Sequence, residues 1–141
     1  MSVEDERALI RTTAVKGVES ASDIARRVGE TRTYVLMSYA LAVAASRKFP
    51  EESGPDAVPE FVADLVNRYP QITRILDPKT AEAVLWAALG DTGKLDGVDA
   101  DDARVLLYFL TYEIMSETPL GDIELGAYID SVLELAAAET P

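Results

Sequence analysis

Hydrophobic positions recur along this chain at spacings of three and four residues, which is the period of an amphipathic α-helix. Stripes of this kind include Leu9, Ile10, Ala14 and Val18 near the start, and further stripes within residues 58–69, 81–89 and 123–136. The regular alternation of apolar and polar residues that is typical of a half-buried strand is not found in the sequence. We therefore predict an all-α fold, with six or seven helices in one compact bundle.

Two segments are apolar on nearly every side, and a helix of that kind is buried. Residues 34–45 carry no charge, and residues 105–114 are apolar over most of the helix circumference. The first segment is too short to cross a membrane, which takes about 20 residues. We predict that both segments form central helices. The other face of the first, with Met37, Tyr39 and Leu41, suits the seam of a homodimer, because stable interfaces are apolar.

Loop and cap signals divide the chain. Residues 49–59 hold three Pro and one Gly, and residues 90–100 form a second loop. Asp77 before Pro78, and Asp99 three residues before Asp102, predict helix starts. Residues 19–22 are expected to link the first two helices, Pro59 to open a helix, and residues 72–76 to form a short helical turn. One domain over residues 1–141 is expected, with subdomains 1–48 and 57–141 joined by the loop 49–56.

Charge is distributed unevenly, with a net charge of −12 at neutral pH. Residues 1–48 hold eight basic and six acidic side chains, whereas residues 49–141 hold five and nineteen. An acidic surface repels nucleic acids and favours basic protein partners. The sequence thus favours a protein-interaction or regulatory module. The residues expected to form its acidic partner surface are Asp91, Asp96, Asp99, Asp101 and Asp102, with Trp86 as an anchor for the partner.

A first alternative is a DNA-binding regulator. Ala25, Gly29 and Val35 have the spacing that resembles a helix-turn-helix within residues 22–35, in which Gly permits the turn. In this interpretation Ser22 and Thr31 cap the two helices. The residues that would contact nucleic acid are Arg26, Arg27, Arg32, Thr33 and Tyr34. Glu30, Ser38 and the uncharged run that follows depart from the usual pattern, so the protein-partner hypothesis is preferred.

A second alternative is a divalent metal held by carboxylates of the Asp91–Asp102 loop. An EF-hand is excluded there, since a loop that starts at Asp91 has Gly93 and Leu95 where oxygen ligands are needed. The chain has no His and no Cys, which removes the usual general base and the commonest metal ligands. We expect no enzymatic activity and no cofactor. The charged N-terminal segment lacks the features of a signal peptide, so a cytoplasmic protein is expected.

Overall fold

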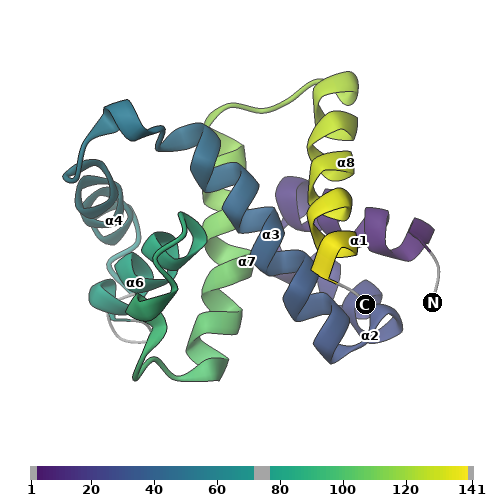
Figure 1. Cartoon of the computed structure of the whole chain (residues 1–141), viewed down its shortest axis with the longest axis horizontal. Helices are drawn as coiled ribbons and strands as arrows, with labels where there is room; N and C mark the ends of the chain where they lie inside the picture. The colour runs from purple at the N-terminus through teal and green to yellow at the C-terminus, as the bar shows by residue number, and fades with distance from the viewer. Residues whose placement is uncertain (1–2, 72–76, 140–141) are drawn as a thin grey trace.

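The computed structural model describes residues 3–71 and 77–139, and for Val18 only the backbone. These residues form seven α-helices and contain no strand, which confirms the predicted fold class (Figure 1). The α-helices are α1 (Val3–Lys16), α2 (Val18–Val28), α3 (Glu30–Lys48), α4 (Ala57–Arg68), α6 (Pro78–Ala88), α7 (Ala100–Glu117) and α8 (Asp122–Glu139). Two short 3₁₀ helices, η1 (Glu51–Ser53) and η2 (Thr92–Leu95), lie in the predicted loops. The helical turn predicted at residues 72–76 lies outside the described residues.

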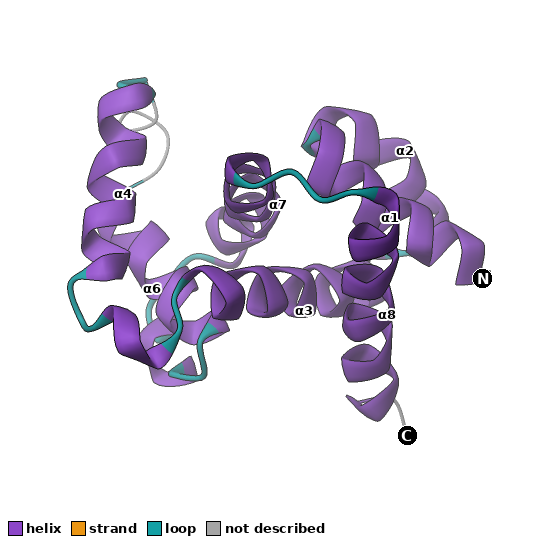
Figure 2. Cartoon of the chain, turned by 90° about the horizontal axis from the view of Figure 1, so that it is seen from above, coloured by secondary structure: helices purple, strands orange, loops and turns teal. Residues whose placement is uncertain are grey.

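Helices α3 and α7 form the centre of the molecule, as their apolar sequences predict. Helix α3 packs against α7, α8 and α6, and α7 packs in addition against α1. Figures 1 and 2 show α4 and α6 on one side of this pair and α1, α2 and α8 on the other. Helices α1, α6 and α8 therefore pack directly on the central pair, whereas α2 packs mainly against α1 and α4 against α6.

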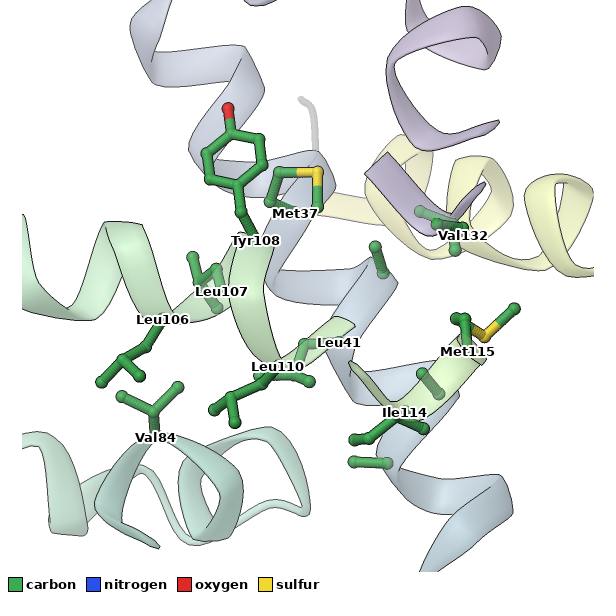
Figure 3. Close-up of a cluster of buried hydrophobic side chains, with 14 of the residues drawn as sticks. Met37, Leu41, Val84, Leu106, Leu107, Tyr108, Leu110, Ile114, Met115 and Val132 are labelled. Carbon is green, nitrogen blue, oxygen red and sulfur yellow. The ribbon is translucent and has the colours of Figure 1, made fainter. Parts of the chain in front are cut away.

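The inner face of α3 is part of the hydrophobic core. Met37 is 1% exposed and Leu41 is fully buried, and Figure 3 shows both in one cluster with Leu110 and Ile114 of α7. The predicted homodimer seam of Met37, Tyr39 and Leu41 is therefore wrong for Met37 and Leu41, which are buried within the chain. Helical periodicity alone cannot tell which face of an all-apolar helix is buried inside the chain. Helices α7 and α8 pack against α3 and bury these residues.

Single glycines turn the chain between the first three helices. Gly17 and Gly29 have φ angles of 90° and 99°, in the region that side chains with a Cβ rarely adopt. Because one residue suffices for each turn, α2 already begins at Val18 and the predicted link at residues 19–22 is helical. The predicted caps are also wrong. Ser22 lies inside α2 and donates to the Glu19 carbonyl at 2.9 Å, and Thr31 lies inside α3, which follows Gly29 directly.

Aspartate caps mark the starts of α6 and α7, as predicted. The Asp77 carboxylate accepts a hydrogen bond from the Lys79 amide at 3.1 Å, and Asp99 accepts from the amides of Asp101 and Asp102 at 2.9 and 3.2 Å. Pro59 is the third residue of α4 rather than the first. That position is tolerated because the first four amides of a helix have no partner within it.

Helix α8 is anchored to α3 through a buried tyrosine. The Tyr128 hydroxyl donates to the Ala40 carbonyl at 2.7 Å, and its side chain is fully buried. Burial raises the pKa of Tyr128 because it penalises the phenolate. The guanidinium of Arg47 lies 5.5 Å from the centre of the ring, within the range of a cation–π interaction. The neutral phenol therefore fixes the position of α8 along α3.

Candidate functional site

The basic residues of the α2–α3 corner are paired with acids of the same chain. Arg26 lies 3.2 Å from Asp23, with both side chains strongly exposed, and Arg27 lies 3.4 Å from Asp5 of α1. Exposed pairs of this kind are weak, at about 0–1 kcal/mol. The side chains of Arg26 and Arg27 are 79% and 56% exposed, and contact between them and DNA stays a prediction.

The next two residues of that corner take part in the fold itself. Arg32 donates two hydrogen bonds to the Glu6 carboxylate of α1, from Nε at 2.9 Å and from Nη2 at 3.2 Å. The hydrogen bond with Glu6 raises the pKa of Arg32, although burial opposes it. The Thr33 hydroxyl is buried and donates to the Ala25 carbonyl at 3.3 Å. These side chains join α1, α2 and α3, whereas Tyr34, one residue later, is 37% exposed.

The aspartates from Asp91 to the first turn of α7 are exposed to solvent but have different neighbours. Asp99 caps α7, and Asp101 lies 3.2 Å from Arg104, which also lies 3.3 Å from Glu30 of α3. Asp91, Asp96 and Asp102 form no ion pair within the described part of the chain. We call the exposed aspartates of this segment the acidic rim, namely Asp91, Asp96, Asp99, Asp101 and Asp102.

Metal binding by these carboxylates stays a prediction. Within residues 3–71 and 77–139, no group of three or more His, Cys, Asp or Glu side chains is placed to hold a metal ion. Asp99 is directed at the first amides of α7, and Asp101 is directed at a guanidinium. The aspartates are therefore neighbours in sequence without sharing a common centre.

A groove on the outer side of α3 lies beside the acidic rim. The α3 groove encloses about 320 Å³, and helices α6 and α7, η2 and the end of α8 supply its walls. Figure 2 shows α6 and α8 at different positions along the length of α3. The residues that line the groove are mostly apolar or small: Tyr34, Val35, Ser38, Tyr39, Ala42, Val84, Ala87, Ala88, Thr92, Leu95, Ala103, Leu107 and Glu139.

One polar contact crosses the α3 groove. A hydrogen bond with Glu139 of α8 raises the pKa of Tyr39 on the α3 side, and burial adds to the effect. Tyr39, predicted as part of a dimer seam, thus lies at the groove together with Tyr34. No pattern in the sequence indicated this groove, because its walls come from separate segments of the chain.

Trp86 lies outside the α3 groove. It is half-buried against the core and lines a second cavity together with Phe49, Val58 and Leu89. A position at the edge of the core agrees with its place one residue off the buried stripe of α6. Its role as an anchor for a partner stays a prediction.

Glu113 of α7 is a buried acid that the sequence analysis did not identify. The Tyr69 hydroxyl donates to its Oε2 at 3.3 Å, and Arg68 of α4 lies 3.6 Å from its Oε1. Burial raises the pKa of Glu113, and the bond from Tyr69 and the charge of Arg68 oppose this only in part. The one signal in the sequence is a single Glu inside a run that is otherwise apolar on most sides. The arrangement holds α4 against α7.

No helix in the described residues is long and apolar enough to span a bilayer. Comparisons of the chain with models of known families, with curated proteins and with solved structures found no match.

Proposed function

We propose that this chain is a non-enzymatic interaction module of the cytoplasm, and that its acidic rim binds a basic region of a partner protein. One observation carries the proposal. Asp91, Asp96 and Asp102 are exposed and have no cationic partner in the described residues, in a chain of net charge −12. Carboxylates that the fold does not use are free to attract a ligand.

The local charge supports a basic partner. Lys94 is the one basic residue between Gly90 and Ala100, where three aspartates lie. Like charges on one surface add to a common field, which attracts a basic partner and repels nucleic acids and acidic membranes. Attraction of this kind is screened by salt. Binding through the acidic rim is therefore expected to weaken as the salt concentration rises.

The direct test uses a labelled oligolysine peptide and the full chain, with fluorescence anisotropy at low and at high salt. The triple variant Asp91→Asn, Asp96→Asn, Asp102→Asn removes three rim charges and leaves the Asp99 cap in place. Each lost pair between a rim aspartate and a peptide lysine should cost roughly 0.5 kcal/mol. We therefore expect the triple variant to lose about tenfold in affinity at low salt.

A matched control variant, Glu52→Gln, Glu60→Gln, Glu134→Gln, removes three exposed charges at a distance from this segment in the sequence. We expect it to bind almost as the unchanged chain does. Equal weakening by both variants would show a dependence on net charge alone, and absence of binding at low salt would end the proposal. Light scattering on the same samples tests whether a second copy of the chain is the partner.

A further inference from the structure

The acidic rim and the α3 groove have one wall in common. Thr92 and Leu95 of η2 line the groove, and Asp91 and Asp96 flank η2 in the sequence. Ala103 of α7 also lines it, one helical turn after Asp99. At the other end, Glu139 of α8 adds a carboxylate to the groove. The apolar floor on α3 thus has the carboxylate of Glu139 at one end, and two aspartates directly flank its η2 wall in the sequence.

We propose that the α3 groove receives the apolar side chains of an amphipathic helix in the partner, while the lysines and arginines that flank those side chains lie against the acidic rim. This inference rests on the proposed function and specifies the form of the basic partner. An amphipathic helix in an apolar groove is an established mode of recognition. Charge complementarity favours a basic helix, because Glu139 lines the groove and Asp91 and Asp96 directly flank its η2 wall in the sequence.

The size and the lining of the groove fit anchoring side chains. A volume of about 320 Å³ lies near the lower end for ligand sites, so it suits one or two large side chains rather than a whole helix. Small residues such as Ala42, Ala87 and Ala88 leave this space open. An extended peptide is less suited, because the described residues offer no strand edge to which it could add.

The apolar lining of the groove is expected to contribute binding free energy that the acidic rim alone does not provide. Apolar side chains that fill a pocket and lose contact with water contribute most of the binding energy in many interfaces. The aspartates then supply attraction and orientation. A peptide with both features is therefore expected to bind more tightly than a peptide with the charge alone.

The first experiment compares two peptides of about 18 residues, a length that gives about five helical turns. One has a leucine face and a lysine face, and in the other serines replace the leucines. The full chain carries ¹³C-labelled alanine methyl groups. We expect the leucine peptide to shift the resonances of Ala42, Ala87 and Ala88, and the serine peptide to leave them in place. Ala127 and Ala137, exposed on α8, are internal controls.

The second experiment fills the groove without changing the charge. Ala42→Phe places a ring at the floor of the groove, and Ala127→Phe is the matched control on an exposed face of α8. We expect Ala42→Phe to lower the affinity for the leucine peptide about tenfold or more, which is the effect of losing one anchoring side chain. Binding of the serine peptide should not change. Thermal unfolding of both variants shows whether they keep the fold. If a variant does not fold, the methyl shifts of the unchanged chain still test the groove.

The outcomes separate the two proposals. Leucine-peptide binding that moves no groove resonance, is unaffected by Ala42→Phe and is weakened by neutralising the rim would overturn the groove and leave the proposed function in place. Groove shifts that persist undiminished after Asp91, Asp96 and Asp102 are replaced by Asn would identify the groove as a site for uncharged apolar ligands and overturn the basic helix. Absence of binding by either peptide would overturn both.

Discussion

The contact between α1 and α3 and the segment from Asp91 to the first turn of α7 treat charged side chains in opposite ways. In the former, Glu6 and Arg32 form a pair whose side chains are only 9% and 23% exposed, and it joins α1 to α3. In the latter, Asp91, Asp96 and Asp102 lie in solvent without a cationic partner in the described residues. The charged side chains stabilise the packing of helices in the first region, whereas in the second region they face solvent.

This difference indicates which charges the fold can lose. A partly buried pair with two hydrogen bonds leaves an unpaired carboxylate behind when its cation is removed, and that is costly. Exposed carboxylates contribute little to stability and add to repulsion at a highly charged surface. The fold is therefore expected to tolerate the loss of the Asp91, Asp96 and Asp102 carboxylates, and four predictions test the contrast.

The largest effect is expected for Arg32→Met. This substitution removes both hydrogen bonds to Glu6 and leaves that carboxylate buried without its guanidinium. The free energy of unfolding should fall by about 2 kcal/mol, as for charged hydrogen bonds elsewhere. Urea unfolding measures the loss.

Arg26→Met is the control for that substitution. The side chains of Arg26 and Asp23 are each 79% exposed. Their pair should contribute less than about 0.5 kcal/mol, because solvent screens it. Equal effects of the two substitutions would refute the difference between a partly buried pair and an exposed pair.

Glu113 gives a smaller, pH-dependent effect. Its pKa is raised above 4.5 in the folded chain, so the folded state still holds the proton at pH values at which the unfolded state has released it. Stability from this group should fall as the pH rises from about 4.5 to its folded pKa, and stay constant above. Glu113→Gln, neutral throughout, should lack this slope. Melting temperatures of both proteins across that range measure the difference, and parallel curves would contradict it.

A smaller effect still is expected from neutralising Asp91, Asp96 and Asp102 together. The free energy of unfolding should change by less than about 0.5 kcal/mol, with a slight gain at low salt because repulsion is reduced. Thermal unfolding at two salt concentrations measures it, with the Glu52, Glu60 and Glu134 variant as control. A marked loss of stability would show that these carboxylates are part of the fold after all.

No effect is expected in a gel shift with random duplex DNA at low salt. Arg32 and Thr33, two of the residues predicted to contact DNA, are bonded to Glu6 and Ala25, and the chain has a net charge of −12. Retardation that weakens with salt and with replacement of Arg26 and Arg27 would instead support the helix-turn-helix interpretation.

The sequence predicted the fold class and the helix starts that depend on local chemistry. Asp77 and Asp99 cap helices because the amides they accept from lie two or three residues away. The pair of Glu6 and Arg32 spans 26 residues and depends on how α1 packs against α3, which no local pattern encodes. The same reason explains why Met37 was assigned to the wrong side of α3.

The candidate site was predictable in part. The acidic rim follows from the sequence alone, because five aspartates lie within twelve consecutive residues and charged side chains remain in solvent. The α3 groove does not, because Val35, Val84, Leu107 and Glu139 come from four helices. Its existence depends on the angles at which those helices cross.

The hydrogen bond from Tyr128 to Ala40 also bears on the order in which the protein is made. It joins residues 88 positions apart, and Arg7 of α1 pairs with Asp130 of α8 across 123 positions. On the ribosome, α1–α3 emerge long before α7 and α8, which cover them. Until α8 is synthesised, part of the apolar surface of α3 faces water and is open to chaperones and to aggregation. The hydrogen bond from Tyr128 to Ala40 can thus form only after α8, which follows α3 along the chain, has been synthesised.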